Sequence, residues 1–86
     1  MEAGVMNKLM PEVIKYYDRK VIALMIEKYG FDPMEALRTF LTSQTHAMLE
    51  DRDFGMTDFG PFGVFDIWEA ERVTGNPRNS VYIRAE

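Results

Sequence analysis

Apolar residues recur at steps of three and four along the first third of the chain, which predicts a long helix from about residue 10 to residue 29. Pro11 fits the first turn of such a helix, where its missing N–H does least harm. Gly30 can take the left-handed conformation that often ends a helix. Residues 1–8 lack the periodicity and are expected to form a loose leader. The apolar face consists of Met10, Val13, Ile14, Tyr17, Val21, Leu24 and Met25.

The next four-residue segment, Asp32-Pro33-Met34-Glu35, predicts the start of a second helix. The Asp side chain can accept hydrogen bonds from the free N–H groups of the first turn, the Pro suits the first helical position, and the Glu completes a reciprocal cap. A kink or a fresh start is expected near Ser43, because Thr and Ser are mediocre helix formers. The short connection after Gly30 predicts that the two helices form a helical hairpin.

A third helix is predicted to begin near Pro61 and to end at Gly75. It carries three aromatic residues, Phe62, Phe65 and Trp68. The loop before it is expected to be ordered, with a short strand at residues 54–57. Residues 80–84 are predicted to form a strand that pairs with residues 54–57 or with another chain. The predicted fold is therefore mainly α: a helical hairpin, a third aromatic helix packed across it, and a short C-terminal β-strand.

Composition supports one ordered domain across residues 1–86. A chain of 86 residues suits a single core, and 47% apolar with 13% aromatic residues argues against disorder. The absence of cysteine excludes disulfide and thiolate chemistry and favours a cytoplasmic location. No apolar run approaches the roughly 20 residues of a membrane span, and no signal peptide is evident. We expect a cytoplasmic protein without a membrane partner.

The net charge of −4 is unevenly distributed. Between Glu50 and Glu71 there are seven acidic residues against one Arg, whereas residues 72–86 carry three Arg against one Glu. The acidic block disfavours a nucleic-acid partner, because it repels phosphate. It is either a solvated face or a surface that steers a basic protein partner.

Candidate catalytic and metal-binding residues are few. His46 is the only histidine, and Ser43 lies one turn before it, but no third group or oxyanion hole accompanies them. The acids between Glu50 and Asp58 lack calcium-loop spacing, because Met56 stands where that loop needs Gly and Phe62 where it needs Glu. We therefore predict no enzyme activity, no metal site and no cofactor.

Other charged residues have structural and functional interpretations. Glu69 and Glu71 lie on opposite sides of the predicted helix and are expected to be solvated. Arg78 follows a rigid Asn-Pro pair, so it could present its guanidinium to a carboxylate or phosphate of a partner. Alternatively it forms an ion pair with the acidic block.

Aromatic side chains are usually core residues, but in a chain this short some of them could form an interface, where aromatic residues are enriched. We interpret the aromatic helix and the basic C-terminal segment together as the partner-binding surface. The predicted partner-binding residues are Phe62, Phe65, Trp68, Arg78, Tyr82 and Arg84.

Two thirds of the chain, from Glu27 to Arg84, resembles a family of small uncharacterised bacterial proteins, a domain of unknown function. The resemblance is carried by K-Y-G-F-D-P-M-E-A-L-R-T-F-L-T-S, T-H-A-M-L-E-D, F-D-I-W-E-A-E and T-G-N-P-R-N-S-V-Y-I-R. The family is similar in size and setting to components of toxin–antitoxin or accessory gene clusters. The resemblance implies a non-enzymatic protein that binds a partner.

The segments D-F-G-P-F and G-N-P-R also resemble pieces of histone-like bacterial DNA-bending proteins. In those proteins an Asn-Pro pair at the tip of a β-arm wedges into the minor groove. The resemblance implies Pro77 as the wedge and Arg78 and Arg84 as phosphate contacts. The sequence departs from the pattern, because Asp66 and further acids stand where a basic strand is needed.

Taken together, these patterns predict a non-catalytic protein–protein interaction module, an antitoxin-like or accessory subunit. The predicted partner is another protein or a second copy, as a homodimer joined through the C-terminal strand or the aromatic helix. The alternative is a nucleic-acid-binding protein that uses the turn and strand of residues 76–84. An exposed aromatic patch would favour a protein partner. A continuous basic surface would favour a nucleic-acid partner, and a deep pocket at His46 would favour catalysis.

Overall fold

A computed structural model describes residues 3–51 and 53–84, with side chains for residues 11–51 and 53–83. The protein is mainly helical, and the described residues contain no β-strand. None of the described helices is long and apolar enough to cross a lipid bilayer. The elements are α1 (Ala3–Tyr29), α2 (Pro33–Leu41), α3 (Gln44–Glu50), η1 (Met56–Phe59), α4 (Gly60–Thr74), η2 (Pro77–Asn79) and α5 (Val81–Arg84), where η denotes a 3-10 helix.

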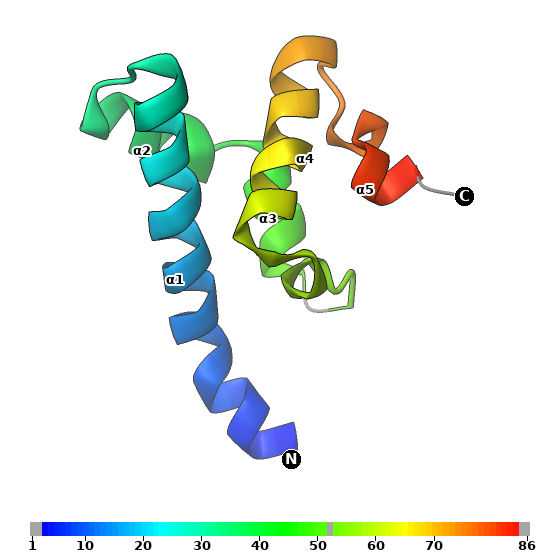
Figure 1. Ribbon diagram of the computed structural model, residues 1–86. Helices are drawn as coiled ribbons and strands as arrows, with labels where there is room; N and C mark the ends of the chain where they lie inside the picture. The colour runs from blue at the N-terminus through cyan, green and yellow to red at the C-terminus, as the bar shows by residue number, and fades with distance from the viewer. Residues whose placement is uncertain (1–2, 52, 85–86) are drawn as a thin grey trace.

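Helix α1 begins earlier than the sequence pattern predicts. It includes residues 3–8, which were expected to be a leader, and Pro11 consequently lies inside the helix. Proline has no N–H to donate to the carbonyl four residues earlier, so it bends helices. Figure 1 shows α1 bending in its N-terminal third. Gly30 ends the helix with a φ of 71°, as predicted.

The predicted boundaries of the next helices are confirmed. The Asp32 carboxylate accepts a hydrogen bond from the backbone N–H of Met34 at 3.1 Å, and Pro33 opens α2. The predicted fresh start falls at Ser43, whose hydroxyl accepts a hydrogen bond from the backbone N–H of His46 at 3.1 Å and so caps α3. Gly75 ends α4 with a φ of 82°.

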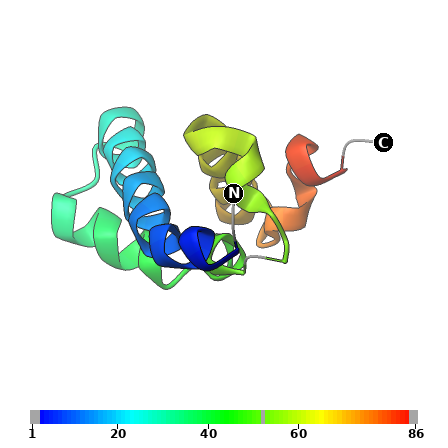
Figure 2. The same ribbon diagram turned by 90° about the horizontal axis from the view of Figure 1, so that it is seen from below.

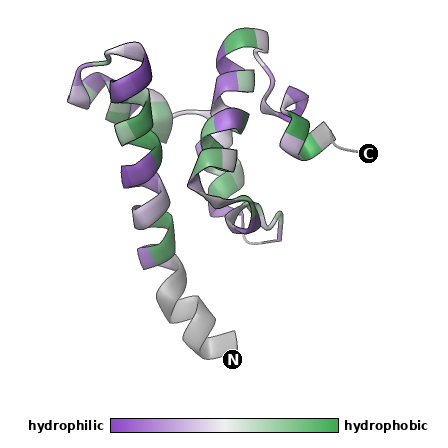
Figure 3. Cartoon of the chain, viewed as in Figure 1, coloured by the Kyte–Doolittle hydropathy of each residue, from purple (hydrophilic) through white to green (hydrophobic). Residues whose placement is uncertain are grey.

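Helix α4 is the centre of the fold, because it contacts α1, α3, η1, η2 and α5. Figures 1 and 2 show it between α1 on one side and α5 on the other. Hydrophobic residues recur along the part of α1 that runs beside α4 (Figure 3). Burying each large core side chain contributes roughly 1.5–3 kcal/mol. The core consists of Tyr17, Val21, Met25, Ala36, Phe40, Leu49, Met56, Val64, Phe65, Ile67 and Trp68.

Both predicted strands are wrong. Residues 54–57 enter η1 through Gly55, whose φ of 74° breaks an extended backbone. Without that segment, residues 80–84 have no strand to pair with, and local caps favour helical turns instead. The Asn76 side chain accepts a hydrogen bond from the backbone N–H of Arg78 at 2.9 Å, and the Ser80 hydroxyl accepts one from the backbone N–H of Tyr82 at 3.2 Å.

Candidate functional site

The three aromatic residues of α4 lie in different environments. Trp68 and Phe65 are 3% and 8% exposed, and their rings stack with centroids 5.9 Å apart. Phe62, one turn before Phe65, is 72% exposed. Two members of the predicted partner-binding set are therefore in the core, and one is accessible to a partner.

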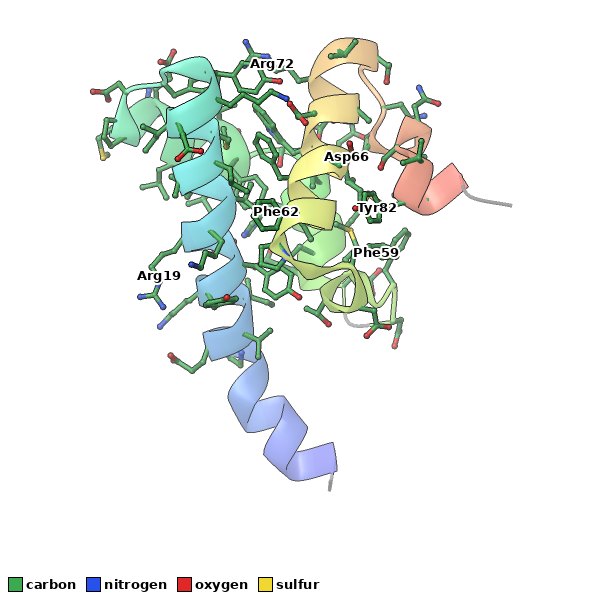
Figure 4. All side chains as sticks on the ribbon, in the orientation of Figure 1. Arg19, Phe59, Phe62, Asp66, Arg72 and Tyr82 are labelled. Carbon is green, nitrogen blue, oxygen red and sulfur yellow. The ribbon has the colours of Figure 1, made fainter. Side chains whose placement is uncertain are left out.

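Helices α1 and α4 run side by side in the same direction (Figure 1), and their C-terminal halves are tightly joined. We name the residues that join them the Arg72 cluster: Tyr29, Phe31, Phe65, Trp68 and Arg72. The Arg72 guanidinium lies 4.5 Å from the ring centroid of Tyr29, 5.0 Å from Phe31 and 5.6 Å from Trp68. A cation over several aromatic faces is attracted to each of them. Figure 4 shows Arg72 where α1 approaches the C-terminal half of α4.

Glu69 reinforces this junction. Its carboxylate accepts hydrogen bonds from the Lys28 ammonium at 2.6 Å and from the Tyr29 hydroxyl. Burial raises the pKa of the Glu69 carboxyl, but these two hydrogen bonds outweigh burial and lower the pKa below 4.5. The expectation that Glu69 is solvated is wrong, because its charge connects α4 to α1.

Glu71 is also structural, although it was expected to be solvated. Its carboxylate accepts hydrogen bonds from the backbone N–H groups of Gln44 and Thr45, both at 2.9 Å, and from the Thr45 hydroxyl at 2.6 Å. A carboxylate at a helix N-terminus satisfies free N–H groups and interacts favourably with the helix dipole. Glu71 therefore fixes α3 against α4.

An open groove lies between α1 and the N-terminal turn of α4. Its volume is about 330 Å³, and we name it the α1–α4 groove. Phe62 stands between the two helices (Figure 4), and Tyr16, which is 46% exposed, lines the same groove. The groove is lined by Tyr16, Lys20, Ala23, Leu24, Glu27, Pro61 and Phe62.

The spacing of the α1 residues explains why they line one groove. Residues 16, 20, 23 and 27 are separated by steps of four, three and four, so they share one face of α1. The core residues Tyr17, Val21 and Met25 occupy the adjacent face. The apolar periodicity of the sequence does not indicate this half of the site. The sequence feature that points to it is Tyr16, a large aromatic residue outside the predicted apolar face.

The predicted C-terminal site residues belong to η2 and α5, and Figure 1 shows α5 on the other side of α4 from α1. Tyr82 is partly exposed and packs on Phe59, with ring centroids 5.8 Å apart. Its ring also approaches Gly63 so closely that a Cβ there would lie 3.2 Å from it. The side chain of Arg84 lies outside the described residues.

The Arg78 guanidinium lies 5.4 Å from the Phe54 ring centroid and makes no ion pair with the described acidic residues. The alternative in which it pairs with the acidic block is thus wrong for the part of the chain described. Pro77 is fully buried, so it is not a wedge at the tip of an arm. Residues 76–84 pack against α4 instead of projecting as a β-arm.

His46 is buried between α1 and α3. Its Nε2 lies 3.1 Å from Oδ1 of Asp18, and its Nδ1 lies 3.6 Å from Oε1 of Glu50. The ring stands edge-on to Phe40, with centroids 5.2 Å apart. Contact with Asp18 raises the pKa of His46 above 6.5, although burial opposes the rise. Ser43 is engaged as a helix cap and also donates its hydroxyl proton to the Phe40 carbonyl at 2.6 Å.

The fold and site describe a small, mainly helical protein with an open apolar groove between two helices. Within the described residues, no three His, Asp or Glu side chains are placed to hold a metal ion. Comparisons with protein-family models, curated proteins and solved structures found no match. The family resemblances therefore stay predictions from the sequence motifs.

Proposed function

We propose that the protein is a non-catalytic protein–protein interaction module that binds a helical segment in the α1–α4 groove. We propose that it acts in the cytoplasm as an accessory or antitoxin-like subunit. The observation that carries it is Phe62, an aromatic side chain 72% exposed at the edge of a groove of about 330 Å³. Exposed aromatic residues beside an apolar groove mark interaction sites more often than isolated surface residues do.

The chemistry of the groove suits an apolar helix. Tyr16, Leu24 and Phe62 provide apolar walls, and burying one such side chain contributes roughly 1.5–3 kcal/mol. Aromatic residues are also the side chains that most often dominate binding energy at interfaces. The charged residues Lys20 and Glu27 would set the orientation of the bound helix.

The proposal is tested by photo-cross-linking in cells. A benzophenone amino acid replaces Phe62 in one variant and Val73 in a control. Val73 is also on α4 and is highly exposed, but it lies three turns further along, outside the groove. We expect a discrete cross-linked protein at position 62 and none at position 73. Equal products at both positions, or no product at position 62, would overturn the proposal.

A further inference from the structure

The face of α1 that lines the groove is complementary to itself in charge. Lys20 and Glu27 are both exposed, and neither forms an ion pair with another described residue. They lie equally far, about 5 Å along the helix axis, on either side of the midpoint between Ala23 and Leu24. We propose that the partner in the groove is a second copy of this chain, whose α1 packs antiparallel to the first. This inference rests on the proposed function.

The antiparallel arrangement follows from the signs of the charges. A two-fold axis between Ala23 and Leu24 brings Lys20 of each copy to the height of Glu27 of the other, so two opposite-charge pairs form. A parallel arrangement in register would instead place Lys20 against Lys20 and Glu27 against Glu27. The charges therefore favour one orientation and oppose the other.

The side chains near the axis also suit a close helix pair. Ala23 is small, so the two helices can approach to the 8–10 Å typical of packed helices. Leu24 would meet its own counterpart beside the axis. Tyr16 and Phe62 would then cover the sides of the incoming helix and lose their contact with water.

Another exposed apolar surface lacks this complementarity. Val73 and Val81 lie in a shallow depression between α4 and α5 that Asp66 and Glu69 also line. No Lys or Arg lines that depression. The Lys28 ammonium is already paired with Glu69, so two copies that met there would bring the Asp66 carboxylates together without a free cation between them. The α1–α4 groove is therefore the better self-association surface.

Charge exchange tests the inference with the purified full chain. Lys20→Glu and Glu27→Lys are made singly and together, and sedimentation velocity is measured over a wide concentration range. We expect the wild type to dimerise. The dimer dissociation constant of each single variant should be at least about tenfold larger, because two attractive pairs become repulsive. The double variant should regain dimerisation. An equimolar mixture of the single variants should form a heterodimer, in which both pairs attract again.

Arg19→Glu is the matched control, because it makes the same change in charge on the same helix. Figure 4 shows Arg19 pointing away from α4, and it does not line the groove. This variant should dimerise like the wild type. Circular dichroism checks that every variant is folded.

Two results would overturn the inference. One is a wild-type chain that stays monomeric at the highest concentration. The other is that the two single variants dimerise as the wild type does, or fail to pair when mixed. If position 62 still cross-links to a different protein, the proposed function stands and only the second-copy inference fails. If position 62 cross-links to nothing, the proposed function fails as well.

Discussion

The two ends of the contact between α1 and α4 differ, although the same pair of helices forms both. At the C-terminal end, Arg72 covers three aromatic rings and Glu69 accepts hydrogen bonds from α1. At the other end, Phe62 and Tyr16 border a groove that no described side chain fills. The first end holds the fold together, and we propose that the second binds a partner.

Residue type alone does not explain this difference. Phe62 and Phe65 are the same residue one turn apart on α4, yet one is 72% exposed and the other 8%. What differs is the surrounding structure: the ring of Phe65 stacks on Trp68, whereas Phe62 shares its groove with the small side chain of Ala23. Burial is therefore determined by what lies opposite a side chain, not by its hydrophobicity.

The largest expected effect on stability is in the Arg72 cluster, at the C-terminal end of the contact between α1 and α4. Trp68→Ala should reduce the free energy of unfolding by about 3–5 kcal/mol, because it leaves a cavity among Phe31, Phe65 and Tyr29. Urea denaturation followed by circular dichroism measures this loss. A loss below about 1 kcal/mol would show that Trp68 is not part of a tightly packed junction.

Arg72→Ala should have a smaller effect. It removes the cation above three aromatic rings and exposes their faces, so we expect a loss of about 1–2 kcal/mol. The same urea titration measures it. Arg72→Lys is the control, since it keeps the charge but not the planar guanidinium, and it should recover part of the loss. Unchanged stability in the Ala variant would show that Arg72 does not help to hold α1 and α4 together.

Glu69→Gln should change the pH dependence of stability. The folded pKa of Glu69 is lowered, so its contribution is present above about pH 4.5 and is lost as the pH falls through the folded pKa. The difference in stability between wild type and Glu69→Gln should therefore shrink on acidification. Thermal melts of both proteins between pH 3 and 7 measure it. A difference that stays constant across this range would contradict the role of the Glu69 charge.

At the open end, Phe62→Ser should leave the folded monomer almost unaffected, within about 0.5 kcal/mol. The ring is mostly in water, so little packing is lost. Urea denaturation at a concentration low enough to keep the chain monomeric is the measurement. A loss comparable to that of Trp68→Ala would mean that both ends serve the fold and would remove the distinction between them.

Local signals in the sequence predicted the helix boundaries well. Gly30, Asp32, Ser43 and Gly75 act through their own backbone or through hydrogen bonds a few residues away, so the sequence contains all that determines them. The start of α1 is an exception: Pro11 resembles a residue of the first turn, but it is tolerated inside the helix, which begins at Ala3.

The C-terminal segment and half of the site could not be predicted this way. Residues 80–84 contain the apolar run Val81-Tyr82-Ile83, which resembles a short strand, but a strand needs a partner. Residues 54–57 cannot be that partner, because they lead into the 3-10 helix η1. The exposure of Phe62 and the inclusion of Tyr16 in the same groove depend on how α1 and α4 pack. Likewise, Glu69 and Glu71 look solvated in the sequence because their partners lie 26 to 41 residues away.

Sedimentation velocity of the wild type, Phe62→Ser and Val73→Ser tests the division between the two ends most directly. We expect the wild type and Val73→Ser to associate with rising concentration, while Phe62→Ser stays a folded monomer. Phe62 would then serve association and not folding. If Phe62→Ser associates as strongly as the wild type, the groove is not the interface, and the proposed division between a structural end and a binding end is wrong.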